Sequence, residues 1–266
     1  MLGTSSTPYD LRFNLLGIPA RVHPLFWLTS ALLGGIASEQ VHLPLVITWI
    51  GCVFVSILVH EYGHALMDKR FHGEPSVLLY GLGGLCYPSG HETPGQKLAV
   101  LLAGPGAGFV LFGLVLLATS VVFGVTPAEH VEVVLAQVGL SWHPENLMGA
   151  MAKVGSYPVR LVYWNMLWIN LWWGLVNLLP IFPLDGGQSA QLIWKRFDRR
   201  DGVRRSHILS LVTAGILGVL AFFVNREDLF LPFFFGILAL LNYQVLHALH
   251  QAHAYGTYEE DEWWRN

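Results

Sequence analysis

Hydrophobic residues along this chain gather into six long runs, separated by shorter segments that are rich in polar residues and glycine. The runs cover, approximately, residues 24–38, 42–67, 97–125, 157–182, 207–224 and 229–249. A helix of about 20 mostly apolar residues is long enough to cross a bilayer. The pattern therefore predicts an all-α, multi-pass membrane protein with about six transmembrane helices. The first run is short enough to be a tilted or re-entrant element.

Composition points to the same class. Of the 266 residues, 53% are hydrophobic and only 12% are charged, whereas soluble domains carry about 25% charged residues. We therefore expect the lipid bilayer as a partner, and the net charge of −3 gives no indication of nucleic-acid binding. The two cysteines, Cys52 and Cys86, predict no disulfide framework. We expect neither a signal peptide nor an appended soluble domain, and we expect one membrane domain over residues 1–266.

Basic residues predict the orientation of the chain, because Lys and Arg concentrate on the cytoplasmic side of membrane proteins. With a cytoplasmic N-terminus, twelve Lys and Arg residues fall in inside segments, and three fall outside, namely Lys153, Arg160 and Arg226. This bias predicts that both termini are cytoplasmic. It also places residues 60–64 in the cytoplasmic half of the second run.

The second run contains the motif His60-Glu61-Tyr62-Gly63-His64, which places ionisable side chains at membrane depth. An acidic side chain near the centre of a membrane helix costs about 2.5–3.5 kcal/mol to insert, so we expect it to have a function. On a helix, His60 and His64 lie one turn apart on one face and can bind the same zinc ion. Glu61, next to a ligand, can reach a water at the metal and act as a general base.

A zinc site of this kind needs a third protein ligand and one open position for water. The fourth run ends in NLLPIFPLDGGQ, residues 177–188, where Pro180 and Pro183 must break the helix. Asp185 then falls at the cytoplasmic end of that run. The orientation places this carboxylate on the same side as the histidines and at a similar depth, so Asp185 is the predicted third ligand.

Other polar and small residues of the fourth run carry further expectations. Gly186 and Gly187 are expected to let the chain turn tightly behind the carboxylate of Asp185. Asn177 is a polar side chain in an apolar segment and can donate a hydrogen bond to a substrate carbonyl or to a developing oxyanion. The alternative for Asn177 is a hydrogen bond between helices, and Asn165 and Asn170 on the same run are expected to be packing residues.

The loop after the second run contains SVLLYGLGGLCY, residues 76–87. Ser76 to Tyr80 has strand character, and the glycines that follow allow turns or close backbone approach. Irregular backbone is tolerated at membrane depth only where it lines a protein cavity. The segment predicts a re-entrant β-hairpin, and a tight surface loop is the alternative.

Together these motifs resemble those of the site-2 protease family of intramembrane zinc metalloproteases, in a minimal form without the PDZ or CBS domain that many relatives carry. The resemblance rests on the HExxH motif, on the stretch from Asn177 to Gly186, and on LLAGPGAG at residues 101–108. It covers roughly residues 42–190, which we take as the expected catalytic core.

The resemblance implies one zinc ion per chain, held by His60, His64 and Asp185. It implies that Glu61 is the general base and that Asn177 assists substrate or oxyanion binding. It also implies that the hairpin receives the unwound substrate as an added strand, and we place Leu79 on that pairing edge.

We therefore predict a zinc metalloendopeptidase that hydrolyses a peptide bond within or near the transmembrane segment of a membrane protein, its substrate and partner. The competing hypothesis is a metal transporter or a non-catalytic scaffold on the same fold. A transporter should carry ionisable groups through both leaflets, whereas here they cluster on the predicted cytoplasmic side. A regulatory membrane protein is left open as a further partner.

Two features near the C-terminus stand outside this interpretation. His247, His250 and His253 are spaced three apart and could bind a second metal, although a polar helix face is the favoured alternative. The acidic, tryptophan-containing tail at residues 258–264 is expected to rest at the lipid headgroups.

Overall fold

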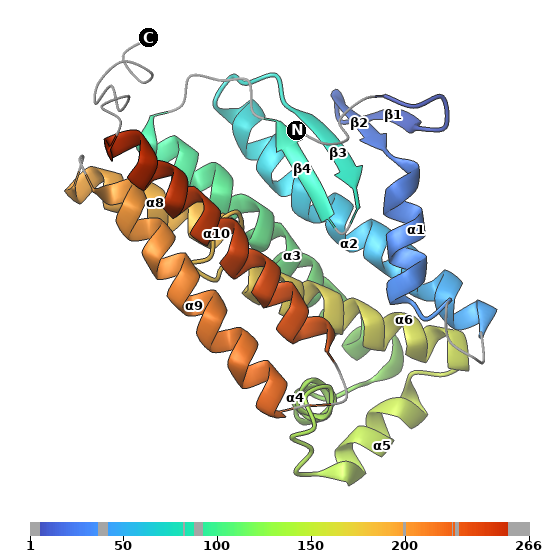
Figure 1. The fold of residues 1–266 in the computed structure, drawn as a ribbon. Coiled ribbons are helices and arrows are strands. Elements are labelled where there is room, and N and C mark those ends of the chain that lie inside the picture. Colours follow the sequence, from blue (N-terminus) through green and yellow to red (C-terminus); the bar gives the residue numbers. More distant parts are fainter. Residues whose placement is uncertain are drawn as a thin grey trace. The chain divides into compact units, whose positions relative to one another are not determined.

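The computed structural model describes residues 6–36, 42–81, 83–87, 93–198, 201–224, 226 and 229–254, with side chains up to residue 252. The chain divides into two compact units, Met1–Leu175 and Val176–Asn266. Elements of the first unit run from β1 to α6 and the π-helix η1, and the second unit contains α8, α9 and α10 (Figure 1).

A small four-stranded sheet lies in the first unit, with the strand order β1-β2-β3-β4. β2 pairs in parallel with β3, and the other two pairings are antiparallel. β3 is therefore an interior strand and β4 is an edge strand. The strands are β1 (Leu11–Leu15), β2 (Ile18–Val22), β3 (Ser76–Tyr80) and β4 (Gly83–Tyr87).

The predicted hairpin at residues 76–87 is present as β3 and β4, but the sheet is larger than predicted. An N-terminal hairpin joins it, with a turn at Leu16 and Gly17, whose φ angles of 54° and 72° are the positive values that a tight hairpin turn needs.

The placement of Leu79 on the pairing edge is wrong, because β3 lies between β2 and β4. The Tyr62 hydroxyl of α2 donates a hydrogen bond to the Ile18 carbonyl of β2 at 3.1 Å, which links the sheet to α2.

The two long helices of the first unit are α2 (Leu43–Arg70) and α3 (Pro94–Phe123). α3 begins at a capping box, in which Thr93 and Gln96 satisfy each other's backbone N–H groups, and it ends at Gly124 in the left-handed conformation. A shorter apolar helix, α1 (Pro24–Leu33), precedes α2. Its ten residues agree with the expectation of a short first element.

The fourth run forms a continuous but irregular helical segment. It consists of α6 (Tyr157–Trp168), the π-helix η1 (Ile169–Trp173) and α7 (Gly174–Asn177). The segment ends about five residues earlier than predicted, just before the proline-containing stretch. In η1, the Asn170 side-chain amide donates to the Ser56 hydroxyl of α2 at 2.9 Å and to the Met166 carbonyl at 2.8 Å. Asn170 therefore joins two helices by a hydrogen bond, which is more specific than the packing role expected of it.

The segment between α3 and α6 is folded. It contains α4 (Pro127–Ala136) and α5 (Pro144–Lys153). The Lys153 ammonium lies 2.8 Å from the Glu129 carboxylate. This hydrogen bond, together with the Thr126 backbone N–H, lowers the pKa of Glu129 to about 2. Glu129 is therefore ionised at neutral pH, and its ion pair links the start of α4 to the end of α5.

In the second unit, a short helix is followed by two long ones. The last turn of α8 (Asp185–Phe197) contains the basic residues Lys195 and Arg196. α9 (Gly202–Val224) and α10 (Phe230–Ala254) pack along each other.

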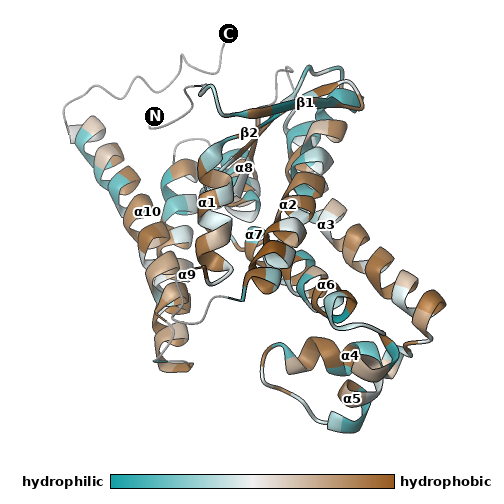
Figure 2. Cartoon of the chain, turned by 90° about the vertical axis from the view of Figure 1, so that its right-hand side faces the viewer, coloured by the Kyte–Doolittle hydropathy of each residue, from teal (hydrophilic) through white to brown (hydrophobic). Residues whose placement is uncertain are grey.

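Among the described residues, four helices are long and apolar enough to cross a membrane, namely α2, α3, α9 and α10. Their apolar residues appear as brown bands along the helices in Figure 2. The protein is therefore mostly helical and has the character of an integral multi-pass membrane protein.

Candidate metal centre

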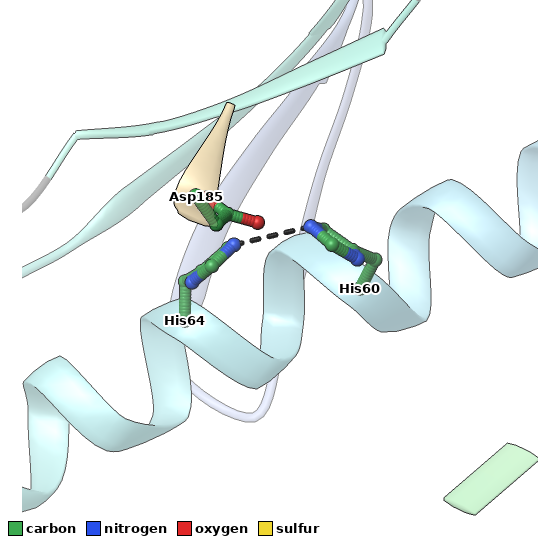
Figure 3. A group of neighbouring side chains, drawn as sticks. All are labelled: His60, His64 and Asp185. Atoms are coloured by element: carbon green, nitrogen blue, oxygen red, sulfur yellow. Dashed lines mark hydrogen bonds between the residues drawn. The ribbon is translucent and has the colours of Figure 1, made fainter. Parts of the chain in front are cut away.

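α2 presents the two predicted histidine ligands on one face, because His60 and His64 are one helical turn apart. Both are buried, with 4% and 6% of their surface exposed, and their Nε2 atoms lie 3.2 Å apart. One potential ligand atom of each histidine and one carboxylate oxygen of Asp185 lie within 4.8 Å of one another. Figure 3 shows these three side chains converging. The structure thus brings together the three residues predicted to bind the metal.

A backbone carbonyl fixes the tautomer of His64. Its Nδ1–H donates to the Val100 carbonyl of α3 at 2.7 Å, and since a carbonyl can only accept, the proton of the neutral ring belongs on Nδ1. The Nε2 lone pair is then available to a metal, which is the arrangement typical of histidine ligands.

The spacing of the two nitrogens fits zinc. Two imidazole nitrogens bound at about 2.0–2.1 Å to one tetrahedral zinc ion would lie about 3.3 Å apart, close to the observed 3.2 Å between the Nε2 atoms. A carboxylate oxygen completes a three-residue donor set that leaves a fourth position open. His60, His64 and Asp185 would hold the ion.

Missing side chains on α3 make room for the centre. A Cβ atom built on Gly104 would overlap the Nε2 end of the His64 ring. On α2, a Cβ on Gly63, the residue before His64, would overlap the Ala103 carbonyl of α3. The small-residue stretch at 101–108 therefore allows two helices to approach closely and leaves space for a metal ligand.

β4 lies directly against the predicted base. A Cβ atom built on Gly84 would overlap the Glu61 side chain, whereas one on the neighbouring Gly83 would meet only Trp173, at 3.7 Å. Glu61 itself is 6% exposed. The sequence indicated close backbone approach in this hairpin, but it did not identify Glu61 as the group approached.

Asp185 is the first residue of α8, with its neighbour Leu184 as the N-cap. Helix N-termini favour negative charge, so this position suits a carboxylate ligand. The expectation for the glycines that follow is wrong. No separate tight turn forms at Gly186 and Gly187. Both residues are helical and belong to the beginning of α8, and neither has a positive φ angle.

Asn177 is the last residue of α7 and is 8% exposed. Its assignment to substrate or oxyanion binding stays a prediction. His247 and His250 lie exposed on α10. In the described part of the chain, His60, His64 and Asp185 form the only group of three or more residues that could hold a metal ion. The side chain of His253 and the acidic tail lie outside the described residues.

The contact between Gly104 and His64 predicts a metal-binding defect. Gly104→Ala should displace the imidazole and weaken zinc binding by about 10–100-fold, as is typical when the support of a ligand is disturbed. Competition with a chromophoric chelator measures this affinity. Gly106→Ala is the matched control, since a Cβ at Gly106 would meet nothing within 4 Å. Equal affinities for the two variants would contradict the packing argument.

Comparison with known proteins places this site in a family. Residues 48–221 match the model of peptidase family M50. A zinc metalloprotease of Methanocaldococcus jannaschii is 28% identical over 187 residues, 70% of this chain and 45% of the relative. The stage IV sporulation protein FB of Bacillus subtilis is 25% identical over 196 residues, 73% of this chain and 52% of the relative. This chain thus spans about half the length of these two relatives.

A solved structure supports the fold. The site-2 protease from Methanocaldococcus jannaschii aligns with a TM-score of 0.54 and 19% identity over 90% of this chain and 95% of that one. The family match covers well over half of the 266 residues and includes both histidines, Glu61 and Asp185. The chain therefore belongs to peptidase family M50.

Proposed function

We propose that this chain is an intramembrane zinc endopeptidase, which hydrolyses a peptide bond within or near the transmembrane segment of a membrane protein. The observation that carries the proposal is the buried cluster of His60, His64 and Asp185, with Glu61 directly after the first ligand on an apolar helix. Membership in peptidase family M50 and the name of the archaeal relative as a zinc metalloprotease support the same chemistry. One zinc ion per chain is the proposed stoichiometry.

Each residue of the centre has a proposed task. Zinc, when bound, supplies a Lewis acid that polarises a carbonyl group and lowers the pKa of water. Glu61 takes the proton of the attacking water and returns it to the leaving amine. Val100 keeps the His64 ring oriented through its carbonyl. Asn177 donates a hydrogen bond to the oxyanion that develops at the scissile carbonyl.

The outer edge of β4, on the side away from β3, is the proposed docking site for the unwound substrate. The His23 N–H donates to the Leu79 carbonyl at 2.9 Å, so the backbone polar groups of Leu79 face β2. Because these groups alternate along a strand and Leu79 pairs with Gly84 in the β3–β4 register, those of Gly84 face away from β3. A strand added there would lie beside Glu61.

The proposed topology has about six transmembrane segments in one domain over residues 1–266. The charge bias supports cytoplasmic termini and a centre near the cytoplasmic side. The partners proposed are the bilayer and a transmembrane protein substrate, with a regulatory membrane protein left open.

Removing the base separates an enzyme from a scaffold or transporter. Glu61→Gln keeps the shape of the side chain but cannot accept a proton at neutral pH, so cleavage of a substrate that the wild type cuts should fall by about 10²- to 10⁴-fold. Zinc content by metal analysis should remain at one ion per chain, whereas a His60→Ala, His64→Ala double variant should lose it.

Gly84→Ala is a second route to the same defect, because the added methyl group would displace Glu61, and Gly83→Ala is its matched control. Near-normal cleavage by a zinc-loaded Glu61→Gln variant would rule out Glu61 as the base. Unchanged zinc in the double histidine variant would rule out the metal site.

Strand addition predicts an alternating requirement for substrate amides. A strand on the β4 edge uses every second backbone N–H for pairing. N-methylation of single amides in a peptide substrate should therefore lower kcat/KM by about 10-fold at alternate positions, roughly one hydrogen bond each, and have little effect between them. A profile without alternation would contradict docking as a strand.

Topology is testable by labelling in a Cys86→Ser background, which leaves only the buried Cys52. Glu145→Cys and Phe197→Cys place thiols at exposed positions of α5 and α8. An impermeant maleimide should label the first variant in intact cells and the second only after permeabilisation. The reverse pattern would overturn the orientation.

A further inference from the structure

Four polar side chains are buried within α9 and α10, although both helices are apolar enough to cross a membrane. Ser206, His207, Ser210 and Asn242 are each 3% exposed or less. Polar groups at such positions are costly unless their hydrogen bonds are made. The proposed reaction uses none of these four residues, so their partners indicate what else they do.

Ser210 and Asn242 bind the backbone of the segment that leads to Asp185. The Ser210 hydroxyl accepts from the Phe182 N–H at 3.0 Å and lies 3.1 Å from the Pro180 carbonyl, to which it can donate. The Asn242 side-chain amide donates to the Phe182 carbonyl at 2.7 Å. Side chains from two helices therefore hold both backbone polar groups of Phe182, three residues before the predicted ligand.

His207 orients the amide of Asn242. Its Nδ1 lies 2.7 Å from Asn242 Oδ1, and since that oxygen can only accept, His207 donates there. The interaction leaves the NH₂ group of Asn242 directed at Phe182. The ring of His207 also contacts the ring of Phe182 edge-on, with centroids 5.0 Å apart.

The other side of the segment packs against the start of α8. A Cβ atom on Gly186 would overlap the backbone of Leu178 and Leu179, and one on Gly187 would overlap that of Ile181 and Phe182. The backbone of residues 178–182 thus lies between the glycines of α8 and the polar side chains of α9 and α10. Its position is fixed on both sides.

We propose that Ser210 and Asn242 are positioning residues for the third metal ligand, and that His207 orients Asn242 for this role. The inference rests on the metal site of the proposed function. They hold the backbone of the proline-containing segment in the conformation that places the Asp185 carboxylate at the metal centre. The alternative is a purely structural role in packing α9 against α10. Hydrogen bonds to Leu238 and Ser206, each within its own helix, would satisfy these side chains without any contact to residues 180–182.

Ser210→Ala tests the proposal, with Ser206→Ala as its matched control. Ser206 is similarly buried in the same helix, but its hydroxyl donates to the Val203 carbonyl of its own helix at 2.7 Å. Ser210→Ala should weaken zinc binding by about 10–100-fold, and Ser206→Ala should not. Ser210→Thr, which restores a hydroxyl, should recover affinity. Asn242→Leu should weaken binding in the same way.

A double-mutant cycle separates positioning from general destabilisation. In an Asp185→Ala background no carboxylate is left to position, so Ser210→Ala should no longer change zinc affinity. Melting of the metal-free variants reports folding independently, and Ser210→Ala should melt close to Ser206→Ala. A loss of zinc affinity on Ser210→Ala that persists without Asp185 would overturn the proposal.

The experiment also distinguishes the two levels of inference. If Asp185→Ala itself leaves zinc affinity unchanged, the metal site of the proposed function fails. If Asp185→Ala weakens binding but Ser210→Ala and Asn242→Leu do not, the metal site stands and the positioning role is wrong.

Discussion

Polar and ionisable side chains inside apolar helices cost free energy unless partner groups meet them, and the rest of this structure depends on how that requirement is met. His60, Glu61 and His64 are all buried on α2, a helix apolar enough to cross a membrane. The proton on Nδ1 of His64 is matched by a backbone carbonyl. The Nε2 atoms of His60 and His64 and a carboxylate oxygen of Asp185 converge, and a divalent cation bound among them would take all three as ligands. The burial that is unfavourable for the metal-free side chains therefore favours binding of the metal.

Close packing around these groups limits what their neighbours can be. Small residues in membrane helices usually serve to bring two backbones together, and Gly63 has that role against α3. Gly104 and Gly84 do something more specific, because the space left by their missing side chains is filled by a metal ligand and by the predicted base. A methyl group at Gly104 would collide with His64, and one at Gly84 would collide with Glu61. We therefore expect either change to impair catalysis more than folding.

The sequence predicted those parts of the site that depend on local periodicity. The pairing of His60 with His64 follows from helix geometry alone, and the hairpin at residues 76–87 follows from strand character next to glycines. The N-terminal hairpin was missed because β2 is only five residues long and includes Pro19, so its alternation of buried and exposed positions is brief. The π-helical segment has no comparable signal in the composition of the fourth run.

Apart from the approach of Asp185 to the histidines, which the orientation predicted, specific contacts between distant parts of the chain could not be predicted from one sequence. Gly84 meets Glu61 only because of the way β4 lies against α2, which depends on strand register and helix packing together. Ser210 and Asn242 resemble ordinary polar residues of membrane helices. Their local sequence does not indicate a contact with Phe182, which lies 28 and 60 residues earlier in the chain. Asp185 lies near the two histidines as predicted, but the glycines that follow it belong to α8 and not to a separate turn.

The prolines explain why the third ligand needs support from other helices. Pro180 and Pro183 have no backbone N–H, so the segment before Asp185 cannot hold itself by a regular ladder of hydrogen bonds. In an apolar surrounding, water is a poor substitute partner, and the remaining polar groups of the backbone must be met by side chains. Ser210 and Asn242 meet them at Pro180 and Phe182. The same prolines that end the preceding helix, and so free Asp185 to begin a new one, thereby make its position depend on α9 and α10.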